Sequence, residues 1–273
     1  MKIGLLHPGE MGVSVGTAAL KCGHEVYWLP AGRSPATLER ASRAGFAAHG
    51  SLGSLLECVD AVISVCPPHG ALDLAREVVD AGFSGVFVDA NAVSPRTARQ
   101  LQQIVGTNFV DGGIIGPPVA GPGTTRLYLS GECAAQVVEW LSDSSLDVRS
   151  IAGPPGAASA LKMCYAAYTK GSSALLLAIR ALAAAEGVTD ALLAEWDISQ
   201  ANLQARSTAA ARATAGKAWR FVGEMEEIAH TFEAQNLPGG FHEAAAEIFR
   251  RMSGLKDSAD PSLEDALTLL NGK

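Results

Sequence analysis

Two glycines near the start of the chain are spaced as a dinucleotide-binding turn requires. An apolar run that ends at Leu6 is followed by His7, Pro8, Gly9, Glu10, Met11 and Gly12. In the G-x-G-x-x-G pattern, backbone N–H groups at the start of a helix bind a pyrophosphate. Gly9 and Gly12 supply the second and third glycines, and His7 occupies the first position. The segment predicts a cofactor-binding turn, with an ordinary strand-to-helix turn as the alternative.

The end of the second predicted strand indicates which nicotinamide cofactor would bind. NAD sites usually place a carboxylate about 20 residues after the glycine turn, where it binds the ribose diol. Here the strand is followed by Leu29-Pro30-Ala31-Gly32-Arg33-Ser34, which contains no carboxylate. A guanidinium and a hydroxyl can instead bind a 2′-phosphate. Arg33 and Ser34 therefore predict NADP (NADPH), whereas a solvent-exposed loop arginine is the alternative.

Short apolar runs alternate with helical stretches up to about Ile151. The runs lack polar alternation, which is typical of strands covered on both faces of a parallel sheet. They lie at residues 3–6, 26–29, 61–65, 86–88, 108–110 and 127–129. After a turn at 153–156 the sequence becomes rich in Ala and Leu at helical spacing. We expect helices at about residues 157–185, 190–214, 217–235, 241–255 and 262–270.

These patterns predict an α/β protein with two domains. Residues 1–153 are expected to form an N-terminal Rossmann domain that binds NADP through a doubly wound, mainly parallel sheet. Residues 154–273 are expected to form a C-terminal all-helical domain, which begins with one long helix.

Composition and charge exclude several other classes of protein. With 48% hydrophobic and 18% charged residues in 273, the chain can form packed cores, and disorder is not expected. A formal net charge of -7 disfavours nucleic acid as a partner. The five cysteines are scattered and never form a Cys-x-x-Cys pair, so we expect no disulfide framework, no metal site and a cytoplasmic location.

A membrane or secretory segment is also not expected. The first apolar run, at residues 3–6, is too short for the core of a secretory signal. The most apolar later window, at residues 166–185, contains Lys170 and Arg180, which would be costly to bury in lipid.

Four stretches of the sequence follow one another in a characteristic order. They read GLLHPGEMG at 4–12, VDANAVSP at 88–95, VDGGIIGP at 110–117 and GAASALK at 156–162. This order resembles the β-hydroxyacid dehydrogenases, which are related to 3-hydroxyisobutyrate dehydrogenase, 6-phosphogluconate dehydrogenase and the imine reductases. The resemblance covers nearly the whole chain. It implies a nicotinamide-dependent oxidoreductase whose helical domain takes part in substrate binding and dimerisation.

The resemblance implies a proton carrier on the long predicted helix. Lys162 lies where the family has its catalytic lysine, and a lysine of lowered pKa can act as general acid and base. Tyr165 stands near the position of a family asparagine and is either a second proton donor or a packed aromatic. Thr169 continues the same polar stripe at helical spacing. The alternative for Lys162 is a lysine whose ammonium lies in water.

Further contacts with the cofactor and the substrate follow from the same resemblance. The cofactor is expected to pass Cys66, Pro67, Pro68 and Asn91. The substrate is expected to contact Ile115, Gly116, Thr169 and Trp219. Ile115 replaces a family serine, which favours a less polar substrate, and Trp219 is alternatively a core residue.

Three functions therefore remain open. The first is NADP-dependent exchange of a hydride with a small hydroxyacid or a related alcohol or carbonyl compound, with Lys162 as general acid and base. The second is an NADPH-dependent imine reductase, and the third is a regulatory protein that binds the nicotinamide without turnover. The expected partners are a small-molecule substrate and a second copy of the chain in a homodimer.

Overall fold

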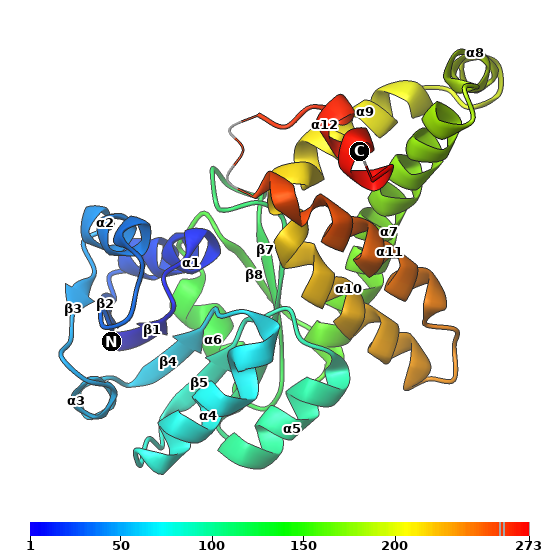
Figure 1. Ribbon diagram of the computed structural model, residues 1–273. Coiled ribbons are helices and arrows are strands. Elements are labelled where there is room, and N and C mark those ends of the chain that lie inside the picture. Colours follow the sequence, from blue (N-terminus) through cyan, green and yellow to red (C-terminus); the bar gives the residue numbers. More distant parts are fainter. Residues whose placement is uncertain (257, 259, 273) are drawn as a thin grey trace. The chain divides into compact units, whose positions relative to one another are not determined.

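The computed structural model describes residues 1–256, 258 and 260–272. The chain divides into two compact units, Met1–Met163 and Cys164–Lys273 (Figure 1). The boundary expected between residues 153 and 154 lies in the turn before the long helix, whereas the compact units divide inside that helix. The reason is that the first two turns of the helix pack against the sheet.

Within residues 1–163, all of which the structure describes, eight strands form one sheet in the order β3-β2-β1-β4-β5-β6-β7-β8. They are β1 (Lys2–Leu6), β2 (Glu25–Trp28), β3 (Ala47–Ala48), β4 (Ala61–Ser64), β5 (Val86–Asp89), β6 (Phe109–Ile115), β7 (Arg126–Ser130) and β8 (Asp147–Ser150). All neighbours are parallel except β6 and β7. This doubly wound order confirms the predicted fold class. The sequence did not predict β3 and β8, because β3 has two residues and β8 is polar and half-exposed.

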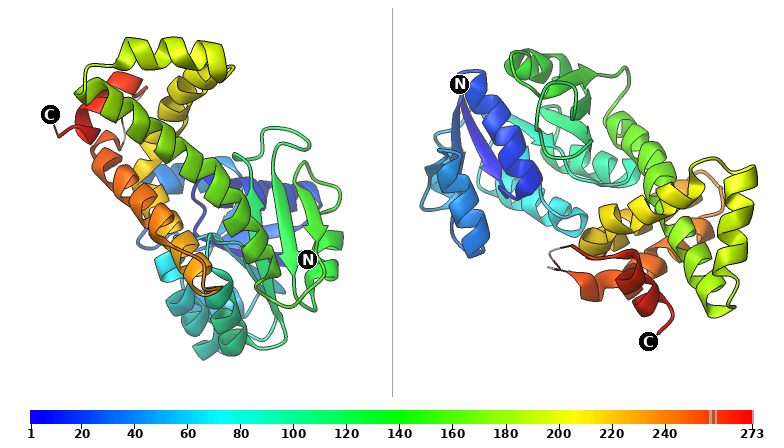
Figure 2. Two further views of the ribbon diagram at one scale, coloured as in Figure 1. Left: turned by 90° about the vertical axis from the view of Figure 1, so that its right-hand side faces the viewer. Right: turned by 90° about the horizontal axis from the view of Figure 1, so that it is seen from above.

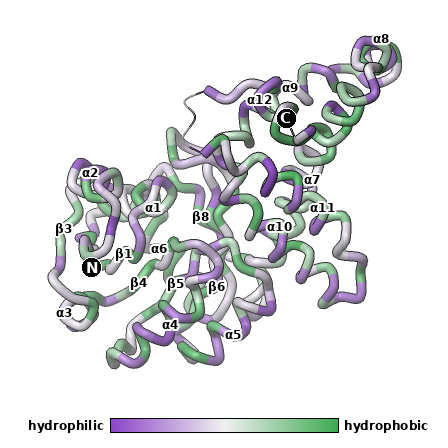
Figure 3. Tube along the Cα trace, viewed as in Figure 1, coloured by the Kyte–Doolittle hydropathy of each residue, from purple (hydrophilic) through white to green (hydrophobic). Residues whose placement is uncertain are grey.

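Helices cover both faces of the sheet. They are α1 (Glu10–Lys21), α2 (Pro35–Arg43), α3 (Leu52–Leu56), α4 (Ala71–Asp80), α5 (Pro95–Val105) and α6 (Ala134–Leu141), with a 3-10 turn at Pro68–Gly70. One core packs α1, α2 and α6 against the sheet, and a second core on the other face packs α3, α4 and α5. In Figure 3, α4 and α5 alternate between hydrophilic and hydrophobic residues, as half-buried helices do.

The second unit consists of helices joined by turns and loops, with no strand among its described residues. Its elements are α7 (Ala157–Ala185), which begins in the first unit, α8 (Thr189–Ser199), α9 (Leu203–Thr214), α10 (Ala218–Glu233), α11 (Gly240–Arg251) and α12 (Leu263–Leu270), with 3-10 turns at Ala215–Lys217 and Met252–Leu255. Figure 2 shows α7 as one long continuous helix, and its bounds match the predicted ones. The single helix expected at 190–214 is wrong. It divides into α8 and α9 because Asn202 adopts a left-handed conformation with φ 66°.

No helix among the described residues is long and apolar enough to cross a membrane.

Four buried polar residues lie side by side across the middle of the sheet. The strand registers pair Ser64 of β4 with Asp89 of β5, Asp89 with Asp111 of β6, and Asp111 with Ser130 of β7. All four side chains are 0% exposed. We call Ser64, Asp89, Asp111 and Ser130 the polar row. Since residues in register on adjacent strands point to the same face, the polar row forms one continuous polar surface inside the first unit.

The polar row fixes the start of α7. Oδ2 of Asp111 accepts hydrogen bonds from the backbone N–H groups of Gly156 (2.8 Å) and Ser159 (3.0 Å) and from the hydroxyl of Ser130 (2.9 Å). Its Oδ1 accepts one from the Ser159 hydroxyl at 2.5 Å. The N–H groups of a first helical turn have no partner within the helix, and a negative charge there is favourable. Asp111 therefore holds the helix that carries Lys162.

Two glycines after Asp111 stand where a side chain would collide with neighbouring backbone, and Gly113 is the one that faces α7. A Cβ at Gly113 would lie 2.7 Å from the carbonyl oxygen of Ala158 and 3.2 Å from Cβ of Lys162. A Cβ at Gly112 would lie 2.8 Å from the carbonyl oxygen of Asp89. The segment Asp111-Gly112-Gly113 thus combines the anchor of α7 with the smooth surface on which α7 rests.

We expect Gly113→Ala to destabilise the first unit, because the added methyl would collide with the backbone of α7. The free energy of unfolding in urea should fall by on the order of 1–3 kcal/mol. Gly53→Ala is the matched control. Gly53 lies in α3, where an added methyl would have no neighbour within 4 Å and where alanine is favoured by helix propensity. Equal stabilities for the two variants would contradict this packing.

The surroundings of Asp89 in the polar row disfavour its ionisation. Burial, followed by the neighbouring Asp111 carboxylate, raises the pKa of Asp89 to about 7, although hydrogen bonds from Asn91 and the charge of Lys162 act in the opposite direction. In the unfolded chain its pKa is close to the ordinary 3.8. The folded state therefore retains a proton that the unfolded chain loses between about pH 4 and pH 7.

The stability contributed by this proton is present at low pH and is lost as pH rises through the folded-state pKa. We expect the wild-type chain to lose on the order of 1–3 kcal/mol relative to Asp89→Asn between pH 5 and pH 8.5. The measurement is urea unfolding of both proteins at several pH values. Asp73→Asn, at an exposed ion pair with Arg76, should show no such trend. A stability difference that stays flat with pH would mean that Asp89 does not titrate in this range.

Candidate active site

The predicted cofactor turn after β1 is closely packed at Gly12 and open at Gly9. Gly9 precedes the first residue of α1, and its N–H donates to the carbonyl oxygen of His7 at 2.8 Å. A Cβ at Gly12 would lie 2.4 Å from that same carbonyl oxygen. Gly12 therefore lets the first turn of α1 pack directly on the strand end, which leaves the N–H groups of α1 at the carboxyl end of β1. Pro8 is buried, Met11 packs against the core and Glu10 is exposed.

His7 replaces the first glycine without changing the left-handed backbone that a glycine would adopt. Its φ is 69°, a conformation that non-glycine residues take rarely. Burial, with a smaller effect of the nearby Arg33 charge, lowers the pKa of His7 to about 4, so its imidazole is neutral at pH 7. The strained position places this neutral ring beside the arginine that the sequence singled out.

Arg33 and His7 both carry buried nitrogens that need a partner. Among the described residues, Nε of Arg33 and Nδ1 of His7 find no hydrogen-bond partner. Burial also lowers the pKa of Arg33, whose side chain is half-buried. A buried donor without a partner is costly, and a guanidinium is well suited to bind a phosphate. These residues therefore fit an anionic group at the carboxyl ends of β1 and β2.

Ser34 and Arg40 complete this edge of the sheet. The Ser34 hydroxyl accepts the backbone N–H of Thr37 at 3.3 Å and so caps α2, while the residue remains exposed. Nη1 of Arg40, in the second turn of α2, donates to the carbonyl oxygen of Pro8 at 3.5 Å. Arg40 was not among the residues predicted from the sequence. The sequence around Arg40 does not indicate that it lies near Pro8, because this contact depends on how α2 folds back toward the strand end.

Asn91 holds the turn that follows β4. Its Oδ1 accepts the N–H of Cys66 at 2.5 Å, and its Nδ2 donates to Oγ of Ser64 (3.1 Å) and Oδ1 of Asp89 (2.5 Å). Burial raises the pKa of Cys66 to about 11, so the thiol stays protonated. Pro67 is exposed and extended, and Pro68 begins the 3-10 turn. The structure thus joins Cys66 and Asn91, two predicted cofactor contacts, through one amide.

Lys162 lies in the second turn of α7 and is partly buried. Its Cβ packs on Gly113, and its charge lowers the pKa of Asp89. Lys162 is therefore near the polar row. Neither Asp89 nor Asp111 was predicted as a site residue, because each stands in an apolar run that gives no sign of its neighbours on other strands.

Ile115 and Gly116 lie at the end of β6. Ile115 is only 6% exposed. Gly116 has φ 120°, and a Cβ there would lie 2.4 Å from the carbonyl oxygen of Thr124. Both residues are closely packed against their neighbours, and the small exposed part of Ile115 is apolar.

The remaining predicted residues belong to the second unit. Tyr165 is 47% exposed and Trp219 is 42% exposed, with the Trp219 ring 4.4 Å from the ammonium of Lys256. The hydroxyl of Thr169 donates to the carbonyl oxygen of Tyr165 at 3.1 Å. Thr169 can therefore offer a ligand only an acceptor while that bond is made.

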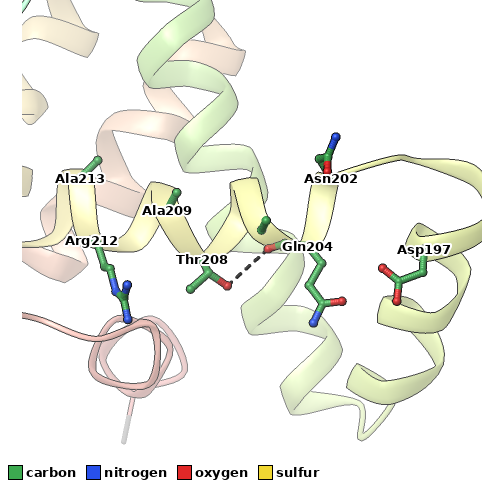
Figure 4. A pocket seen from close by; sticks show the side chains of 8 residues that line it. Asp197, Asn202, Gln204, Thr208, Ala209, Arg212 and Ala213 are labelled. Carbon is green, nitrogen blue, oxygen red and sulfur yellow. Dashed lines mark hydrogen bonds between the residues drawn. The ribbon is translucent and has the colours of Figure 1, made fainter.

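A wide hollow in the second unit does not coincide with any predicted site residue. It has a volume of about 810 Å³ and lies between α8 and α9 (Figure 4). Its walls are formed by Asp197, Asn202, Gln204, Ala205, Thr208, Ala209, Arg212 and Ala213. The Thr208 hydroxyl donates to the backbone of Gln204 at 3.3 Å. The candidate site therefore rests on the residues at the strand ends and not on the volume of a cavity.

Comparisons with known proteins agree with this architecture. A family model described as a domain of unknown function, DUF1932, matches residues 183–252. An uncharacterized 28.5 kDa protein from the 7S RNA 5′ region of Methanothermus fervidus is 32% identical over 194 residues, which is 71% of this chain and 75% of that protein.

Solved structures extend the likeness to nearly the whole chain. A conserved protein of unknown function, described as structurally similar to 3-hydroxyacid dehydrogenases, matches with a TM-score of 0.70 at 27% identity and covers 93% of this chain and 98% of its own. The Mycobacterium tuberculosis 3-hydroxyisobutyrate dehydrogenase with L-serine has a TM-score of 0.73 at 17% identity, covering 98% of both chains. An Aspergillus terreus reductive aminase in complex with NADPH and ethyl levulinate has a TM-score of 0.58 at 19% identity, covering 99% and 98%.

The last two structures, both below 25% identity, bear on the fold alone. The sequence resemblance and the predicted fold class are confirmed by these matches together with the sheet order. The chain belongs to one family with the uncharacterized Methanothermus fervidus protein, and its fold is that of the 3-hydroxyacid dehydrogenases.

Proposed function

We propose that the protein is an NADP-dependent oxidoreductase that exchanges a hydride with a small hydroxyacid or a related alcohol or carbonyl compound. The observation that carries this proposal is the pair of buried nitrogens, Nε of Arg33 and Nδ1 of His7, that find no partner among the described residues. They lie at the strand ends where doubly wound proteins bind the adenosine half of a dinucleotide. The M. tuberculosis relative in fold is a 3-hydroxyisobutyrate dehydrogenase, and the A. terreus structure contains NADPH.

Each strand end would bind a different part of the cofactor. The first N–H groups of α1, after the turn at residues 7–12, would bind the pyrophosphate. Arg33 would bind the 2′-phosphate, with Ser34 and Arg40 beside it. The turn at Cys66, Pro67 and Pro68, held by Asn91, would lie along the nicotinamide. When bound, NADPH supplies the hydride.

Lys162 would carry the proton of the reaction. In its neutral form it accepts the proton of a substrate hydroxyl, and as an ammonium it returns a proton to a carbonyl oxygen. Two observations support this role: the Lys162 stem packs on Gly113, and the charge of Lys162 lowers the pKa of Asp89. Tyr165 would be a second donor, and Ile115, Gly116, Thr169 and Trp219 would contact the substrate.

Reduction of an imine by NADPH is the second candidate. Ile115 lacks the hydroxyl expected for binding a carboxylate substrate, and Tyr165 is an exposed phenol on the same helix as Lys162. The acidic residues of α10 do not add support for an amine substrate, because Glu224 pairs with Lys170 and Glu226 pairs with Arg250. A regulatory protein that binds NADPH without turnover is the third candidate.

A homodimer in the cytoplasm is part of the proposal. Tyr168, Leu175 and Leu182 recur every seven residues along α7 and are 67%, 46% and 62% exposed. Such spacing is typical of a seam between paired helices, so a second copy of α7 would cover these side chains. The five free cysteines fit a reducing compartment.

We expect Arg33→Ala to weaken NADPH binding by about tenfold to 100-fold while NADH binding stays the same, because only NADPH has the 2′-phosphate. Dissociation constants measured by cofactor fluorescence or calorimetry test this expectation. Arg43→Ala is the control, since Arg43 lies at the end of α2, the helix that follows Arg33, in an exposed pair with Glu39. Equal losses for the two cofactors would rule out Arg33 as the 2′-phosphate ligand.

We expect Lys162→Met to lower kcat by about 100-fold or more on a working substrate and to leave the NADPH dissociation constant unchanged. The substrate is found by following NADPH oxidation or NADP reduction across hydroxyacids, oxo acids and cyclic imines. Lys217→Met is the control for loss of a lysine. A greater loss for Tyr165→Phe than for Lys162→Met, with imines as substrates, would favour the second candidate. Tight NADPH binding without turnover on the whole panel would favour the third.

A further inference from the structure

Asp89 is a buried acid that the proposed reaction has not used. Its side chain is fully buried in β5, in register with Ser64 on one side and Asp111 on the other. Polar groups at such depth are retained where they have hydrogen-bonding partners or a chemical role. Two residues of the proposed site act on this carboxyl: Lys162 through its charge and Asn91 through a hydrogen bond.

Lys162 approaches Asp89 from α7. Asp111 and Gly113 are two residues apart on β6, so both point to the same face of the sheet, and Asp89 shares that face through its register with Asp111. The Lys162 stem rests on Gly113. Lys162 therefore packs on the same face of the sheet as Asp89, and its charge acts on Asp89.

Asn91 connects Asp89 to the turn after β4. Its Nδ2 donates to Oδ1 of Asp89 at 2.5 Å, and its Oδ1 accepts the N–H of Cys66 at 2.5 Å. A charged carboxylate accepts a hydrogen bond more strongly than a neutral carboxyl does, and hydrogen bonds in a chain polarise one another. A change of charge on Asp89 is therefore felt at the N–H of Cys66.

Among the described residues, three titratable groups interact with Asp89. Asp111 approaches from β6, Lys162 from α7 and Cys66 from the turn after β4. The oxygens of Asp111 are already occupied by Gly156, Ser159 and Ser130, and the Cys66 thiol stays protonated. Lys162 is thus the facing group of opposite charge, and each of the two ions stabilises the other.

We propose that Asp89 is a positioning residue that couples the charge of Lys162 to the Cys66 turn through Asn91. The inference rests on the proposed function, because it takes Lys162 as the proton carrier. As a carboxylate, Asp89 retains the ammonium of Lys162 and strengthens the bond chain that fixes the Cys66 N–H. When Lys162 gives up its proton, the same chain relaxes. Proton transfer at Lys162 would in this way adjust the turn that is expected to lie along the nicotinamide.

Nuclear magnetic resonance of the whole protein tests this coupling without substrate or cofactor. The chain has seven lysines, so 13C-labelled lysine gives a spectrum in which Lys162→Met identifies the Lys162 signal. The pKa of Lys162 is measured from pH titrations of the wild type, Asp89→Asn and the control Asp73→Asn. Asp73→Asn removes the same charge at an exposed pair with Arg76. The amide signal of Cys66 is followed in the same titrations.

We expect Asp89→Asn to lower the pKa of Lys162 by about one unit and Asp73→Asn to leave it unchanged. In the wild type the Cys66 amide should shift as Asp89 titrates. In Asp89→Asn this shift should vanish, and in Lys162→Met it should move to higher pH because Asp89 loses its favourable charge partner.

Equal Lys162 pKa values in the wild type and Asp89→Asn would overturn the inference, as would a Cys66 titration that Lys162→Met does not move. The second measurement stands even if Asp89→Asn fails to fold. If the NADPH assays fail while the coupling is found, only the proposed function falls. If turnover depends on Lys162 but the coupling is absent, only the role of Asp89 falls.

Discussion

The anchoring of α7 by Asp111 is the interaction on which the candidate site depends. One carboxylate, buried in the sheet, receives both the free N–H groups of the first helical turn and two hydroxyls. Charge-assisted bonds of this kind are shorter and stronger than neutral ones, and they define direction as well as distance. Lys162 follows Ser159 by three residues, so its position relative to β5 and β6 is inherited from this anchor. Packing on Gly113 alone would not fix the position of Lys162 if the Asp111 anchor were absent.

Burying the Asp111 carboxylate costs free energy, and the neighbouring residues of the polar row reduce that cost. Two carboxyls, Asp89 and Asp111, stand on adjacent strands in a region that water does not reach. One of them is satisfied by helix N–H groups, and the other retains its proton until about pH 7. A purely apolar row would be easier to bury, but it could neither hold the start of a helix nor exchange protons. The row is thus a compromise between stability and chemistry.

Much of this architecture was predictable from local sequence. The apolar runs predicted β1, β2 and β4 to β7, and the Ala-rich and Leu-rich stretch predicted α7, because burial on both faces and helical periodicity leave strong patterns. The break at Asn202 was missed because a single left-handed residue interrupts an otherwise helical composition. The very short β3 and the polar β8 leave no apolar run to detect.

The candidate site was predictable only in part for a related physical reason. His7, Arg33 and Lys162 could be proposed because a motif surrounds each of them in the sequence. Asp89 and Asp111 acquire their meaning only from the register between strands that lie about twenty residues apart in the chain, which no local pattern encodes. Arg40 likewise reaches Pro8 only through the fold.

Cys66 has a consequence for the durability of the protein. A cysteine thiolate is usually a point of attack, because thiolates are readily oxidised by peroxides. Here burial raises the pKa of the thiol to about 11, so it stays protonated at neutral pH. The backbone N–H of Cys66 donates to Oδ1 of Asn91. The turn after β4 therefore contains a cysteine with little thiolate character, and Cys164, which is exposed, becomes the natural position for attaching a fluorescent or spin label.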